Sequence, residues 1–86
     1  MQLPRRVVVT GMGLISPLGN SVSESWSNCI KGSSGISENI VDLDDMPIKV
    51  GGRIHDFDPA QYIDSKDIRR LDTFVQYGVS AGIQAI

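Results

Sequence analysis

The residues with the clearest chemical potential follow the first apolar run of the sequence. The stretch Gly11-Met12-Gly13-Leu14-Ile15-Ser16 nearly reproduces the dinucleotide-binding pattern GxGxxG. In that pattern the third glycine lets a helix begin at the motif and pack closely on the preceding strand. Here Ser16 takes the third place, and Pro17 disfavours a helical conformation at Ser16. We therefore interpret the glycines as a turn and not as a nucleotide site.

Clustered aspartates could in principle bind a cation. Asp42, Asp44 and Asp45 lie close together in a polar connector that runs from residue 33 to residue 47. They lack the central glycine and the closing glutamate of an EF-hand calcium loop. We interpret this segment as a solvated acidic connector.

His55 is the other candidate for chemistry, because Asp56 and Asp58 lie beside it. A His-Asp pair suggests acid–base catalysis, but no nucleophile lies within local reach in the sequence. A structural or solvent-exposed role for His55 is therefore favoured.

Length, net charge and cysteine content restrict the kinds of protein that this sequence can encode. The chain has 86 residues, a net charge of -2 and one cysteine. A chain of this length forms at most one small domain. One cysteine excludes an internal disulfide and a cysteine-based metal site, which suits the reducing cytoplasm. We see neither a secretion signal nor a membrane-spanning run, and the charge does not indicate nucleic acid as a partner.

The apolar pattern predicts elements of an α/β protein. The β-branched run Val7–Thr10 predicts a strand covered on both faces, as in a parallel or mixed sheet. Ser21 to Glu24 match the capping box S-x-x-E and predict a helix that ends at Gly32, with Cys29 as a packing residue on its inner face. The segment 48–54 predicts a strand with a bulge at its two glycines.

The carboxyl-terminal part predicts a short turn and then the longest helix. Asp58 and Pro59 suit the N-cap and first position of a short helical turn. Residues 64–86 show apolar residues at helical spacing, and from Phe74 onward the pattern is apolar on nearly all sides, which predicts burial in a larger body. The sequence stops at Ile86 without a helix end signal, so we expect a truncated amino-terminal piece.

Several blocks resemble the β-ketoacyl-acyl-carrier-protein synthases of the condensing-enzyme family, most of all the type II synthases of bacterial fatty-acid synthesis. They are RRVVVTGMGLISPLGNSV, Trp26 with KGSSGI, Gly52 with DFDP, and RRLDTFVQYGVSAGIQAI. The resemblance implies a thiolase-like fold with alternating α-β-α-β-α layers, and a homodimer. Residues 1–86 would be a truncated amino-terminal part of the ketosynthase amino-terminal domain, without a complete second domain.

The resemblance also implies a function. The family performs a decarboxylative Claisen condensation between an acyl group and malonyl-carrier protein, without a metal or another cofactor. The family's catalytic cysteine and histidines match no residue of this chain, so the chain by itself is expected to be inactive. Its basic carrier-protein site matches Lys66, Arg69 and Arg70. We expect these cations at the positive end of the long helix, where an acidic partner would relieve their repulsion by the helix dipole.

Two alternatives stay open at this point. The sequence could belong to a polyketide-type ketosynthase with a similar beginning. It could also be a small non-enzymatic module that binds an acidic partner through its basic residues.

Overall fold

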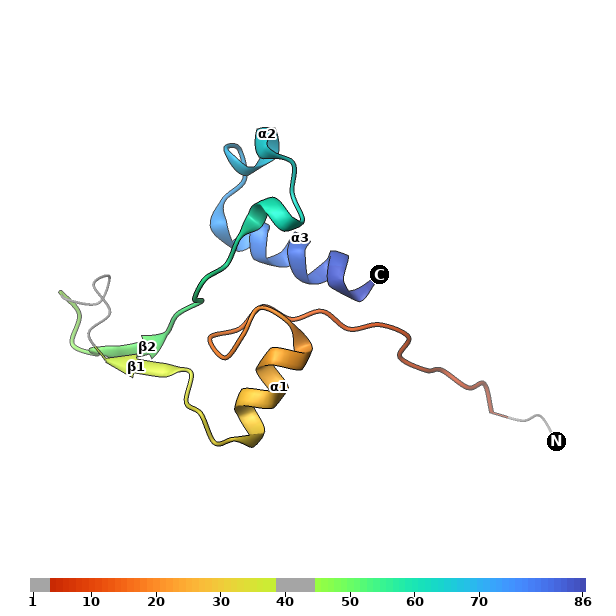
Figure 1. The fold of residues 1–86 in the computed structure, drawn as a ribbon, viewed down its shortest axis with the longest axis horizontal. Helices are drawn as coiled ribbons and strands as arrows, with labels where there is room; N and C mark the ends of the chain where they lie inside the picture. The colour runs from red at the N-terminus through yellow and green to blue at the C-terminus, as the bar shows by residue number, and fades with distance from the viewer. Residues whose placement is uncertain (1–3, 39–44) are drawn as a thin grey trace.

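The computed structural model describes residues 4–38 and 45–86, and these form an elongated chain of helices with one small sheet (Figure 1). The radius of gyration is 17.0 Å, whereas a compact chain of this length would have about 12 Å. The elements are helix α1 (Val22–Ile30), strands β1 (Ile36–Glu38) and β2 (Val50–Gly52), the 3-10 helix η2 (Pro59–Gln61), and helices α2 (Ser65–Ile68) and α3 (Thr73–Ala85). This mixture of helices and strands confirms the predicted α/β class.

Helix α1 begins and ends at the residues that carry the local signals. The Ser21 side chain accepts a hydrogen bond from the Glu24 backbone N–H at 3.1 Å. Glu24 Oε2 in turn accepts from the Asn20 N–H at 3.2 Å, one residue earlier than in a standard capping box. Gly32 follows the helix with a φ of +79°, a conformation that glycine adopts without strain. Both predicted ends of α1 are thus confirmed.

The strand predicted over Val7–Thr10 is not formed. This segment is extended but is not paired as a strand with any described residue, and Val7, Val8 and Val9 are 87%, 68% and 78% exposed. A strand needs a neighbour for its N–H and C=O groups, and the described residues supply none.

The sheet lies elsewhere and has two strands. β1 and β2 pair antiparallel, with Ile36 opposite Gly52 and Ser37 opposite Gly51. β2 lies within the predicted strand 48–54, but the predicted bulge is wrong, because both glycines take part in regular pairing. β1 lies in the segment that we interpreted as a polar connector. Asp42 and Asp44 of that connector lie outside the described residues.

The predicted long helix over 64–86 is divided into α2 and α3. Gln76 contributes to this break, because its Nε2 donates to the carbonyl oxygens of Ile68 at 3.1 Å and Leu71 at 3.0 Å. Carbonyl groups at a helix end need such partners. In the described part of the chain Phe74 is 73% and Ile83 44% exposed, so the burial of α3 in a larger body stays a prediction.

Two glycines bring the amino-terminal segment onto α3 (Figure 1). A Cβ atom at Gly11 would overlap the backbone carbonyl of Ala85, and one at Gly13 would overlap that of Ala81. Real Cβ atoms do not approach a backbone so closely, so only glycine fits at these two places. Close contact with a helix backbone therefore explains the two glycines. The turn that we predicted from them is not formed at residues 11–13 and lies instead between Ser16 and Gly19.

Little apolar surface is buried within the described part of the chain. Ile63, at 8% exposure, is its one buried hydrophobic residue. Phe57 and Tyr77 make an edge-to-face contact with ring centroids 5.1 Å apart. No described helix is long and apolar enough to span a membrane.

Candidate functional site

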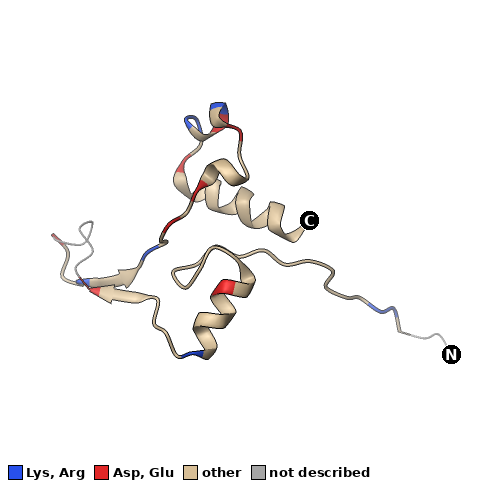
Figure 2. Cartoon of the chain, viewed as in Figure 1, with Lys and Arg blue, Asp and Glu red and all other residues tan. Residues whose placement is uncertain are grey.

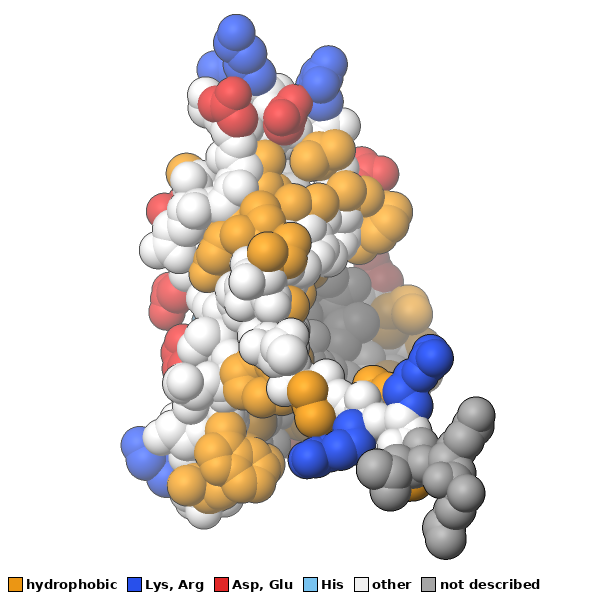
Figure 3. Space-filling view, turned by 90° about the vertical axis from the view of Figure 1, so that its right-hand side faces the viewer, with side chains coloured by type: hydrophobic (Ala, Val, Ile, Leu, Met, Phe, Trp, Pro, Cys, Tyr) orange, Lys and Arg blue, Asp and Glu red, His pale blue; other side chains and the backbone are white. Residues whose placement is uncertain are grey.

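The three predicted carrier-binding residues lie together at one end of the molecule. Lys66 is in α2, Arg69 is its C-cap, and Arg70 is the next residue. All three are exposed. Figure 2 shows basic positions at and just after α2, next to acidic ones, and Figure 3 shows basic side chains projecting from this end of the surface. We call Lys66, Arg69 and Arg70 the basic tip.

The electrostatic reason that we gave for the basic tip is wrong. Lys66 is the second residue of the four-residue helix α2, and Arg69 is the C-cap of that helix. Cations at a helix carboxyl end are favoured by the dipole. The long helix α3 begins only at Thr73, after its N-cap Asp72. The basic tip therefore lies outside the first turn of the long helix, and its availability to a partner depends on exposure and on neighbouring carboxylates.

Arg70 has such a carboxylate within its own turn. Its Nη2 donates to Asp67 Oδ1 at 3.0 Å, and the two side chains are 79% and 48% exposed. An exposed pair of this kind contributes at most about 1 kcal/mol to stability. The pair can therefore open at small cost when another anion approaches Arg70.

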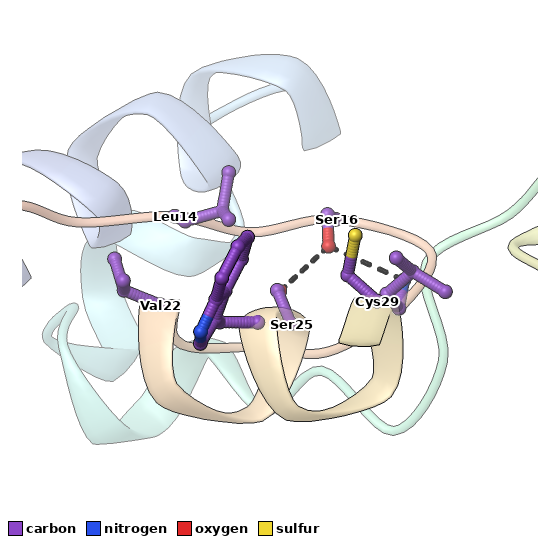
Figure 4. A pocket seen from close by; sticks show the side chains of 7 residues that line it. Leu14, Ser16, Val22, Ser25 and Cys29 are labelled. Atoms are coloured by element: carbon purple, nitrogen blue, oxygen red, sulfur yellow. Dashed lines mark hydrogen bonds between the residues drawn. The ribbon is translucent and has the colours of Figure 1, made fainter. Parts of the chain in front are cut away.

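An apolar cleft lies between α1 and the turn that precedes it (Figure 4). Its volume is about 300 Å³, and its lining residues are Leu14, Ser16, Leu18, Val22, Ser25, Trp26 and Cys29. The hydroxyl groups of Ser16 and Ser25 are 2.7 Å apart and hydrogen-bonded to each other. Ser25 Oγ also lies 3.2 Å from the Gly19 carbonyl oxygen, to which it is hydrogen-bonded. The two serines thus brace the turn, and the cleft suits apolar groups and not acid–base chemistry.

The structure corrects our expectation for Cys29. We predicted a packing residue on the inner face of the helix, but Cys29 is exposed at the cleft. The helical spacing is right, because Val22, Trp26 and Cys29 do share one face. The described residues simply leave that face uncovered, and Trp26 itself is 64% exposed.

We therefore expect Cys29 of the 86-residue chain to react with a maleimide at nearly the same rate with and without urea. Cys29→Ala should change the free energy of unfolding by no more than about 0.5 kcal/mol, as for other surface substitutions. Mass spectrometry of timed samples measures the labelling, and Cys29→Ser is the unlabelled control. Strong protection in the absence of urea would contradict the exposed position.

His55 is exposed, as expected for the solvent-exposed role that we favoured. Its backbone carbonyl accepts a hydrogen bond from Asn20 Nδ2 at 2.8 Å. This bond ties the segment after β2 to the turn before α1. His55 thus has a structural contact through its backbone.

Gln84 is a residue that sequence reasoning missed. Its Oε1 accepts from the Leu14 N–H at 3.1 Å, and its Nε2 donates to the Asn20 carbonyl at 2.8 Å and to the Tyr62 hydroxyl at 3.1 Å. One side chain therefore joins three segments that are far apart in the sequence. The available signal was a lone amide in the otherwise apolar end of α3.

Comparisons with known proteins agree on one family. The family described as beta-ketoacyl synthase, N-terminal domain, matches residues 4–86. Among curated relatives, the 3-oxoacyl-[acyl-carrier-protein] synthase 2 of Vibrio harveyi is 49% identical over 95% of this chain and 20% of its own length. The synthase 2 of Coxiella burnetii is 43% identical over 94% of this chain and 20% of its own length. That of Staphylococcus aureus (strain COL) is 38% identical over all of this chain and 21% of its own length.

The chain thus spans about a fifth of the length of these relatives. The match nevertheless extends over nearly all of its residues, from residue 4 to residue 86. This chain therefore belongs to the beta-ketoacyl synthase family, in the part that corresponds to its N-terminal domain.

Proposed function

We propose that this sequence is the amino-terminal part of a 3-oxoacyl-acyl-carrier-protein synthase of type 2, which condenses acyl groups with malonyl-carrier protein in fatty-acid elongation. The observation that carries the proposal is the 49% identity to the Vibrio harveyi synthase 2 over 95% of the chain. Relatives with 43% and 38% identity bear the same name. These names favour fatty-acid elongation over polyketide synthesis and over a small binding module.

In this proposal, residues 1–86 contribute to the amino-terminal ketosynthase domain and supply no catalytic residue. The exposed positions of Cys29 and His55 fit this assignment, since neither lies in an enclosed, polar site of the kind that supports covalent or acid–base catalysis. The whole enzyme would work as a cytoplasmic homodimer without a cofactor.

We propose that the basic tip is the part of the chain that contacts the protein carrying the substrate. Its three cations are exposed and lie close together in the sequence around α2. The relatives are named for an acyl-carrier protein, and we propose that the basic tip of this chain docks an acidic carrier of that kind. Opposite charges at such a rim act mainly by speeding association.

The test is a charge reversal in a full-length synthase that carries this sequence. Arg69→Glu combined with Arg70→Glu should raise the KM for acyl-carrier protein about tenfold at low salt, equivalent to about 1.4 kcal/mol. Decarboxylation of a small malonyl thioester should stay nearly unchanged, because a small thioester does not contact the basic tip. Added salt should reduce the difference from the wild type.

Arg53→Glu is the matched control, because Arg53 is an exposed arginine outside the basic tip. It should leave the KM for the carrier close to the wild-type value. Equal losses on carrier-linked and small substrates would mean that Arg69 and Arg70 serve the fold, and the docking proposal would then be wrong.

A further inference from the structure

We propose that Asp67 is an internal competitor of the carrier protein for Arg70, and that it thereby limits the affinity of the basic tip. This inference rests on the proposed docking function. The contact that motivates it is the bond from Arg70 Nη2 to Asp67 Oδ1 at 3.0 Å.

The backbone holds the two residues in position for this bond. The Asp67 N–H donates to the Asp64 carbonyl at 2.9 Å, and the Arg70 N–H donates to the Asp67 carbonyl at 3.0 Å. Asp67 and Arg70 are therefore fixed one turn apart, where side chains at positions i and i+3 meet. The pair thus forms from a local arrangement that needs no other segment.

An acidic partner must displace Asp67 before it can bind the same face of the Arg70 guanidinium. The exposures of 79% and 48% leave both side chains open to solvent, so the exchange is sterically possible. The Asp67 carboxylate also repels an acidic partner directly. Loss of its charge should therefore strengthen docking in two ways, by freeing Arg70 and by removing repulsion.

Asp64 provides a control that separates these two effects. It carries the same charge three residues earlier, and as N-cap of α2 it makes no side-chain capping bond. Asp64→Asn removes repulsion but leaves the Arg70 pair intact. Asp67→Asn removes both the repulsion and the ion pair with Arg70.

The experiment measures the dissociation constant of holo-acyl-carrier protein from a full-length synthase that carries this sequence, at low salt. Asp67→Asn should tighten binding about three- to fivefold, and Asp64→Asn about twofold or less, in line with the small energies of exposed pairs. In an Arg70→Gln background, the two asparagine variants should give equal changes, because the guanidinium group that pairs with Asp67 is no longer present.

The outcomes distinguish this inference from the function on which it rests. If Arg69→Glu does not weaken carrier binding, the docking function itself fails, and the role of Asp67 fails with it. If Arg69→Glu weakens binding while Asp67→Asn does no better than Asp64→Asn, docking stands and only the competition is overturned. The same result follows if the advantage of Asp67→Asn survives in the Arg70→Gln background.

Discussion

Replacing Gly13 by alanine should destabilise a full-length synthase that carries this sequence by about 3 kcal/mol or more. The new methyl group would overlap the Ala81 carbonyl oxygen and would lie 2.7 Å from its carbon and 2.8 Å from Gln84 Cβ. Helix backbone cannot yield as a flexible side chain can, so the amino-terminal segment would have to move away from α3. Overpacking of this kind typically costs 1–3 kcal/mol and sometimes more. Urea unfolding monitored by circular dichroism measures the change.

Gly78→Ala in α3 is the matched control for Gly13→Ala. Outside its own turns of α3, a Cβ atom at Gly78 meets no described atom within 4 Å. Alanine is a better helix former than glycine by about 1 kcal/mol, so this variant should be neutral or slightly more stable. Equal destabilisation by both substitutions would show that glycine is needed for another reason than the contact between residue 13 and α3.

Replacing Gln84 by leucine should cost about 2 kcal/mol of unfolding free energy in the same protein. The leucine has a similar size but leaves the Leu14 N–H, the Asn20 carbonyl and the Tyr62 hydroxyl without the partners described above. Each unpaired group that stays shielded from water adds a desolvation cost of about 1 kcal/mol or more. Thermal unfolding measures the loss.

Tyr62→Phe tests the hydrogen bonds of Gln84 by removing one of its partners, the Tyr62 hydroxyl group. It removes only one of the three bonds to Gln84, at 3.1 Å, and should cost less than Gln84→Leu. Combined with Gln84→Leu, it should add little, because the two residues share that bond. Fully additive effects would contradict the direct coupling of Tyr62 to Gln84.

The features that sequence predicted well depend on residues close together in the chain. Ser21 and Gly32 bound α1 as predicted, and Asp58 caps η2 by accepting from the Ala60 N–H at 3.0 Å. Capping involves neighbouring residues only, so a short sequence window contains all of its determinants.

The features that it missed depend on distant residues. β1 has the sequence Ile-Ser-Glu and no strong strand signal, and it forms because β2 lies opposite. The break between α2 and α3 depends in part on the Gln76 side chain, which donates to carbonyls five and eight residues earlier. The charges of the basic tip could be identified from sequence, whereas the ion pair between Arg70 and Asp67, three residues apart, was found only in the structure.

Val7, Val8 and Val9 follow one another without a polar residue between them. Their side chains therefore do not determine the register in which a partner strand would pair with this segment. A shift by one residue normally exchanges the two faces of a strand and exposes its apolar set. Within Val7, Val8 and Val9, such a shift replaces one valine by another. Slippage is opposed instead from outside the run, because Gly11 and Gly13 fit against Ala85 and Ala81 of α3 and no side chain can take their place. The contacts of Gly11 and Gly13 with α3 therefore fix the position of this segment along its own axis.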